Sequence, residues 1–118
     1  MSIELIHRRV AIFCLNFFHP LSMGTADKLL SLYHLETSEG IKGPMLTYIG
    51  RAYARTNRKY MTSWLANIVM NPREIDVIRC LAYCSLRTVV HHDRDQPPSF
   101  LDCQNVDTVD LEFVQSYL

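Results

Sequence analysis

The stretch that decides the fold lies at residues 44–70 and reads PMLTYIGRAYARTNRKYMTSWLANIVM. Its apolar residues recur every three or four positions, which is the repeat of one face of an α-helix. The residues on this face are Leu46, Ile49, Tyr53, Tyr60, Trp64 and Ile68. Pro44 suits the first position of a helix, because its missing N–H would have no helical partner there. The pattern predicts one long central helix over about residues 44–70.

A break near Thr56 and Asn57 is the alternative to one continuous helix. Both side chains can hydrogen-bond to nearby backbone groups and so compete with helical hydrogen bonds. Asn57 also stands where the apolar repeat expects another apolar residue. A single polar residue in such a stripe is consistent with a helix–helix contact whose register it sets. The sequence leaves both arrangements open.

The rest of the chain also shows helical periodicity. Helices are expected over about residues 3–18, from Thr25 to about 35, over about 72–90 after an Asn71 cap, and over 109–117. No stretch alternates with a period of two beside hairpin turn signals, so a sheet is not expected. The 118 residues fit one domain, residues 1–118, with a flexible loop at about 91–98. The predicted fold is all-α: an irregular bundle of about five helices, with helix 72–90 the most buried.

The charge is balanced overall but unevenly distributed. Residues 1–92 hold eleven Lys and Arg against six Asp and Glu, a net charge of +5. Residues 93–118 hold one Arg against six acids, a net charge of −5. The chain therefore has a basic centre and an acidic tail, and the tail could cover the centre of the same molecule or of a neighbour.

A row of basic residues gives the leading functional hypothesis. On a continuous helix, Arg51, Arg55, Arg58 and Lys59 would share the face opposite the apolar stripe. A rigid row of this kind can pair with several phosphates of RNA or DNA and displace counterions. Tyr48, near the edge of that face, could stack on a base or sugar. We therefore expect a non-enzymatic protein that binds a nucleic-acid backbone. A solvated helix face, or one paired with the acidic tail, is the alternative.

Four residues could in principle bind zinc: Cys80, Cys84, His91 and His92. The two cysteines are one helical turn apart and the histidines follow the helix, but this spacing matches no common zinc module. Buried cysteines on a core helix explain the pattern better. There is also no phosphate-binding glycine loop, nucleophile elbow or HExxH motif. We expect no metal, no cofactor and no enzymatic activity, and a small metal or thiol enzyme ranks third among the hypotheses.

The first helix suggests a second functional hypothesis. It is apolar on more than one side, and Phe17 and Phe18 cannot share one narrow face. Excess apolar helix surface is typical of proteins that self-associate, so a homo-oligomer such as a homodimer is expected. The alternative function to nucleic-acid binding is a regulator or adaptor that presents an apolar groove to a partner helix.

Membrane insertion is not expected. The longest apolar-rich stretch, Val10–Phe18, is interrupted by Asn16 and falls short of the roughly 20 residues that a span needs. Arg8 and Arg9 precede this stretch as in a signal peptide, but no small-residue cleavage site follows. The expected location is intracellular, in the cytoplasm or the nucleus.

Overall fold

A computed structural model describes residues 3–17, 20–90 and 106–118, and this part of the chain is helical with no strand. Five helices have 11 to 15 residues: α1 (Ile3–Phe17), α2 (Met23–Tyr33), α3 (Glu39–Ala52), α4 (Lys59–Val69) and α5 (Asp76–Val90). A 3-10 turn (η2, Val106–Thr108) and a short helix α6 (Leu111–Gln115) follow. The predicted all-α bundle of about five helices is confirmed. The loop predicted at 91–98 lies outside the described residues.

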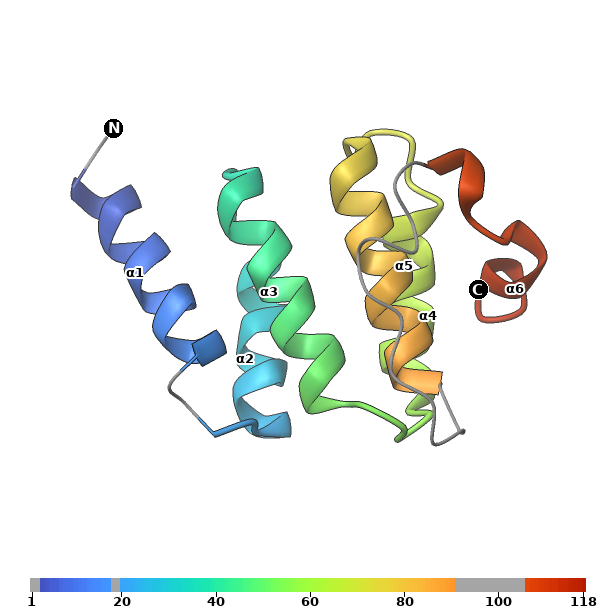
Figure 1. Cartoon of the computed structure of the whole chain (residues 1–118), viewed down its shortest axis with the longest axis horizontal. Helices are drawn as coiled ribbons and strands as arrows, with labels where there is room; N and C mark the ends of the chain where they lie inside the picture. Colours follow the sequence, from blue (N-terminus) through green and yellow to red (C-terminus); the bar gives the residue numbers. More distant parts are fainter. Residues whose placement is uncertain (1–2, 18–19, 91–105) are drawn as a thin grey trace.

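The helices run alternately down and up the molecule, from α1 at one edge to α4 and α5 near the other (Figure 1). Helix α5 packs against both α3 and α4, and most of its residues are buried. It is therefore the centre of the core, as its apolar composition predicts. None of the described helices is long and apolar enough to cross a membrane.

The prediction of one continuous helix over 44–70 is wrong. The chain breaks near Thr56 and Asn57, as the alternative prediction had it. Helix α3 ends at Ala52 and α4 begins at Lys59, antiparallel to it (Figure 1). Arg55 and Asn57 between them have positive φ angles of 62° and 53°. This left-handed conformation ends a helix, and asparagine tolerates it better than most residues. Folding back at this turn lets both halves of the stretch bury their apolar faces on α5.

The turn between α3 and α4 also completes the end of α5. The backbone N–H of Arg55 donates to the carbonyl of Thr88 at 3.1 Å, and that of Asn57 donates to Val89 at 3.2 Å. The last carbonyls of a helix have no partner within the helix itself. The turn supplies that partner from a distant part of the chain.

Four helix starts differ from the sequence expectation. The last helix, expected from residue 109, begins at Leu111 and is capped by Asp110. Ser22, and not Thr25, caps α2 by accepting from the N–H of Thr25 at 3.3 Å. Helix α3 begins five residues before Pro44, whose missing N–H would otherwise bond to the carbonyl of Gly40. Asn71 accepts from the N–H of Arg73 at 3.0 Å within a turn, and α5 begins only at Asp76.

Candidate functional site

Tyr48 is fully buried, which contradicts its predicted position at the edge of a nucleic-acid-binding face. Its hydroxyl donates to the carbonyl of Pro20 and accepts from the N–H of Ser22, both at 3.2 Å. These contacts fix the segment before α2 against α3. Tyr48 cannot stack on a base, because Pro20 and Ser22 cover it from solvent.

The four basic residues are all exposed but do not form a straight row. Arg51 is in the last turn of α3, Arg55 is in the turn, Arg58 caps α4 and Lys59 begins α4. We call this set the basic turn. Because the chain reverses here, the four cations gather at one end of the bundle instead of along one side of a long helix.

The described part of the acidic tail packs on α4 and α5. Phe113 of α6 contacts Tyr83 edge to face, with 6.2 Å between ring centroids. Asp110 caps α6 by accepting from the N–H of Phe113 at 3.2 Å. None of the ion pairs among the described residues involves the basic turn. The other acids of the tail, at residues 93–102, lie outside the described part of the chain.

A polar cluster of Asp27, Tyr53 and Tyr60 lies where α2, α3 and α4 meet. Both phenol hydroxyls reach the same carboxylate oxygen of Asp27, at 2.5 Å from Tyr53 and 3.0 Å from Tyr60. The two hydroxyls also hydrogen-bond to each other. Two phenol protons cannot make all three bonds at once, so the cluster shares its donors around one anion. It ties three helices together next to the basic turn.

The pKa values of two tyrosines are raised. Burial raises the pKa of the Tyr53 phenol, and its hydrogen bonds with Asp27 and Tyr60 raise it further. Burial also raises the pKa of Tyr33, with a further contribution from the negative charge of Glu74. Both phenols therefore stay protonated at neutral pH, which makes Tyr53 a hydrogen-bond donor and not a base.

The Cys/His candidates are only partly described. Cys80 and Cys84 are both buried in α5 within the apolar core. His91 and His92 lie outside the described residues. Among residues 3–17, 20–90 and 106–118, no three His, Cys, Asp or Glu side chains are grouped so that they could hold a metal ion.

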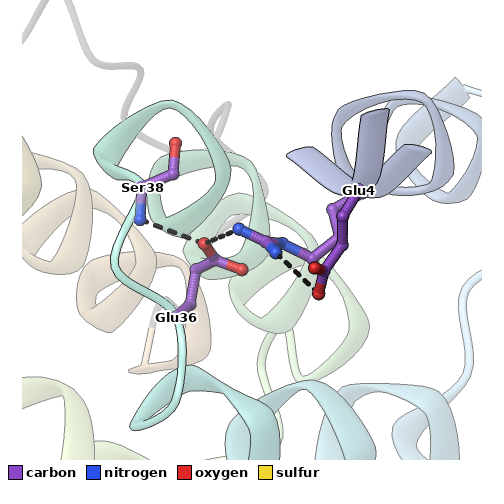
Figure 2. Close-up of polar contacts among 4 residues, drawn as sticks. Glu4, Glu36 and Ser38 are labelled. Carbon is purple, nitrogen blue, oxygen red and sulfur yellow. Dashed lines mark hydrogen bonds and ion pairs between the residues drawn. The ribbon is translucent and has the colours of Figure 1, made fainter. Parts of the chain in front are cut away.

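Helix α1 is joined to the bundle by one buried side chain, by the partly buried Leu5 and Leu15, and by a few polar contacts. Ile12 is 5% exposed and packs into the core. The guanidinium of Arg8 pairs with Glu36 at 3.1 Å and with Glu4 at 3.3 Å, and Glu36 also accepts from the N–H of Ser38 (Figure 2). Further along α1, the amide of Asn16 donates to the carbonyl of Pro44 at 3.2 Å.

The outer face of α1 is apolar and exposed. Ile6, Val10, Phe13 and Phe17 follow each other at intervals of four, three and four, so they share one face. They are 45%, 55%, 53% and 70% exposed, and the rings of Phe13 and Phe17 lie 4.6 Å apart. We call these four residues the α1 stripe. A continuous apolar stripe of this kind is the usual mark of an interaction surface.

An open groove of about 600 Å³ adjoins the α1 stripe, between α1 and α5 with α3 as its floor. The residues that line it are Arg9, Ile12, Phe13, Asn16, Phe17, Gly40, Gly43, Pro44, Thr47, Arg51 and Leu81. We call it the α1 groove. Among the described residues its lining is mostly apolar, and the charged residues there are two arginines. Arg51 also belongs to the basic turn, so the groove opens onto that end of the molecule.

The chain matches no protein-family model, no curated protein and no solved structure. The basic residues and the excess apolar surface of the first helix, with Phe17, were predicted from the sequence, but the set of residues that lines the groove was not. The signal for the stripe was present, because its spacing is that of one helix face, but the same spacing is typical of a core face.

Proposed function

We propose that the protein is a non-enzymatic protein-binding module and that its partner docks on the α1 stripe and the α1 groove. One observation carries the proposal: four large apolar side chains in a row on α1 are about half exposed or more. Water contact with so much apolar surface is unfavourable. Fully burying a side chain of this size contributes about 1.5–3 kcal/mol. A partner that covers the α1 stripe would gain a substantial part of this free energy.

The groove supports the same proposal. It continues the apolar surface inward from Phe13 and Phe17, so a docked partner would contact both a ridge and a hollow. Grooves between helices that receive an apolar helix face are a recurrent form of recognition. The observations favour this function over nucleic-acid binding. It corresponds to the adaptor with an apolar groove, which was the alternative hypothesis from the sequence.

Comparative cross-linking tests the proposal. The full chain, the double variant Phe13→Ser/Phe17→Ser and the double variant Arg58→Glu/Lys59→Glu are each cross-linked in the same cell extract, and the captured proteins are compared. We expect specific partners to be lost with the phenylalanine variant and kept with the charge variant. Both variants alter exposed residues, so circular dichroism should show unchanged helix content. Identical capture by all three proteins would refute the proposal.

Nucleic-acid binding at the basic turn is the second candidate function. It is supported by four exposed cations at one end of the bundle, with none of the described ion pairs neutralising them. Loss of the straight row and burial of Tyr48 weaken it. Binding to short duplex and single-stranded oligonucleotides over a salt series tests it. Affinity that does not change with salt, or with Arg55→Glu/Arg58→Glu, would exclude it.

Self-association remains a prediction of the same surface. A homodimer could use the α1 stripe on both subunits, since a two-fold contact places the same patch on each side. Light scattering over a range of protein concentrations measures this directly. A monomer mass at all concentrations would exclude self-association, and the partner would then be a different protein.

A further inference from the structure

We infer that the end of the bundle with the basic turn binds the surface of a bilayer that contains anionic phospholipids. This inference goes beyond the proposed function and does not depend on the α1 groove. Three features carry it: the free cations of the basic turn, the exposed apolar side chains on either side of them, and the acids gathered at the opposite end of the bundle.

Three cations of the basic turn have charged groups that are available to a ligand. Arg55, Arg58 and Lys59 are exposed, and no group in the described part of the chain pairs with their charges. Arg58 and Lys59 lie at the start of α4, where the helix dipole is also positive and the side chain of Arg58 makes no capping hydrogen bond. The cations and the dipole add to one positive potential, which attracts a negatively charged surface.

Leu21 is an exposed apolar residue near the α3 side of the basic turn. It is 46% exposed and lies in the segment that leads into α2. The residues before and after it, Pro20 and Ser22, both hydrogen-bond to the hydroxyl of Tyr48, which is one turn before Arg51 of α3. These bonds hold the segment against the last turns of α3. The start of α2 therefore lies at the same end of the bundle as the turn between α3 and α4 (Figure 1).

Met23 is an exposed apolar residue near the α4 side of the basic turn. It is 42% exposed and is four residues before Asp27, so the two residues share one face of α2. Asp27 accepts from the hydroxyl of Tyr60, the residue after Lys59. Leu21 and Met23 therefore place apolar surface on both sides of the cations.

Exposed aliphatic side chains beside cations favour a bilayer over a nucleic acid. The phosphates of a nucleic acid would pair with the cations, but its polar backbone offers no apolar surface to Leu21 and Met23. At an anionic bilayer, the cations meet the lipid headgroups, and the apolar side chains enter the boundary between headgroups and acyl chains. Free inorganic phosphate offers only the first of these two contacts. A phospholipid surface is therefore the ligand that uses both kinds of side chain.

Acidic residues gather at the opposite end of the bundle. Helices α1, α3 and α5 all begin there, and each has an acid in its first turn: Glu4, Glu39 and Asp76 (Figure 1). Asp27, an acid near the basic turn, accepts hydrogen bonds from two phenols. An anionic surface orients a molecule with this charge distribution, so that the basic turn faces the lipid and the acids face away from it.

Co-sedimentation with lipid vesicles tests the inference. The full chain is mixed with vesicles of phosphatidylcholine alone, or of phosphatidylcholine with about one-third phosphatidylserine, at low and at physiological salt. We expect binding to the vesicles that contain phosphatidylserine, much weaker binding to the neutral vesicles, and a loss of affinity as salt rises. A short duplex oligonucleotide, titrated by fluorescence anisotropy at the same salt, gives the comparison with nucleic acid.

Two pairs of variants test the cations and the apolar side chains separately. Arg58→Gln should weaken binding to the phosphatidylserine vesicles about fivefold, which is the contribution of one cation at an anionic surface. Its control, Arg73→Gln, removes the same charge at an exposed position between α4 and α5 and should bind within about twofold of the wild type. Leu21→Ser should also weaken vesicle binding about fivefold. Its control, Leu35→Ser, alters a leucine that is 78% exposed past the other end of α2 and should bind like the wild type.

Four outcomes would overturn the inference. The first is equal binding to neutral and anionic vesicles, or no binding to either. The second is vesicle binding that Arg58→Gln weakens and Leu21→Ser does not, because the contact would then be electrostatic only. The third is vesicle binding that is lost with Phe13→Ser/Phe17→Ser and kept with Leu21→Ser, which would place the lipid contact on the α1 stripe. The fourth is tighter binding to the oligonucleotide than to the anionic vesicles, which would make nucleic acid the ligand of the basic turn.

Discussion

The N–H of Arg55 donates to the carbonyl of Thr88 at 3.1 Å while Arg55 itself has a positive φ of 62°. The left-handed conformation of a non-glycine residue costs about 1–2 kcal/mol. The hydrogen bond and the one from Asn57 to Val89 hold the turn in this shape. A bulky cation is thus kept at a position where glycine would fit more easily, which is the kind of exception that function often explains.

Replacing Arg55 by glycine should therefore not destabilise the protein. Relief of the left-handed strain offsets the greater flexibility of glycine in the unfolded chain, which costs about 0.5–1 kcal/mol. We expect the free energy of unfolding of Arg55→Gly to be unchanged or raised by up to about 1 kcal/mol. The matched control is Lys28→Gly, at an exposed position inside α2, where the same change should lose about 0.5–1 kcal/mol. Urea unfolding measures both, and equal losses would contradict the prediction.

Gly50→Ala should destabilise the protein at the contact between α3 and α5. A Cβ at position 50 would lie 2.8 Å from the Cβ of Ser85 and 2.9 Å from its Cα, which cannot move aside as a side-chain tip can. We expect a loss of about 1–3 kcal/mol in the free energy of unfolding.

Gly24→Ala is the control for this substitution. A Cβ there would meet only the Oγ of Ser22 at 3.6 Å, an ordinary contact. Alanine in a helix is favoured over glycine by up to about 1 kcal/mol, so this variant should be unchanged or more stable. If Gly50→Ala melts at the same temperature as Gly24→Ala, the close packing of α3 on α5 is refuted.

Neighbouring substitutions on α1 should have opposite effects on stability and on binding. Ile12 is 5% exposed and Val10 is 55% exposed. Ile12→Ala removes core contacts and should lower the free energy of unfolding by about 2–4 kcal/mol. Val10→Ala should change it by less than about 0.5 kcal/mol but reduce cross-linking to the partners that the Phe13→Ser/Phe17→Ser variant loses. Chemical unfolding and the comparative cross-linking test this, and a Val10→Ala variant that captures the same partners as the wild type would contradict the role of the stripe.

Alkaline pH should destabilise the protein through its buried tyrosines. A raised pKa means that the folded state keeps the Tyr53 proton above about pH 10, where the unfolded state loses it. The unfolded state then binds fewer protons, so the free energy of unfolding falls as pH rises. The stabilisation is complete below about pH 10 and is lost as pH increases toward the pKa of the folded state.

The variant Tyr53→Phe tests this pH dependence. It removes one of the two raised phenol groups, so its free energy of unfolding should fall less steeply between about pH 9 and 11 than that of the wild type. The remaining slope includes the contribution of Tyr33, whose pKa is also raised. Urea unfolding at a series of pH values gives both slopes. Parallel curves for the two proteins would show that Tyr53 does not contribute.

The periodic residues of the chain predicted the class of fold, but not where one helix would give way to the next. Ile49, Trp64 and Ile68 do lie on helices, because each faces a core over its own few turns. Whether the helix would continue across Arg55 and Asn57 depended on α5, because the terminal carbonyls of α5 accept hydrogen bonds from a turn at this point. Such long-range hydrogen bonds cannot be predicted from the spacing of apolar residues at every third or fourth position.

The candidate surfaces were predictable to different degrees for the same reason. Exposure of the basic residues follows from their charge, and the structure has them exposed. The position of Tyr48 was wrong because it was derived from one straight helix, whereas Pro20 and Ser22 cover it. Phe13 and Phe17 have the spacing of core residues, and only the packing of the other helices shows that nothing in the described chain buries them.

Helix α1 has one buried side chain, Ile12, beside the partly buried Leu5 and Leu15, whereas most residues of α5 are buried, and this difference has a consequence for local motion. An element with few buried apolar contacts opens at a lower free energy than the core around α5. Amide hydrogens of α1 should therefore exchange with solvent faster than those of α5 in the unbound protein. A partner bound in the groove would contact both α1 and α3. Slower amide hydrogen exchange along α1 would therefore detect its binding without a label on the partner.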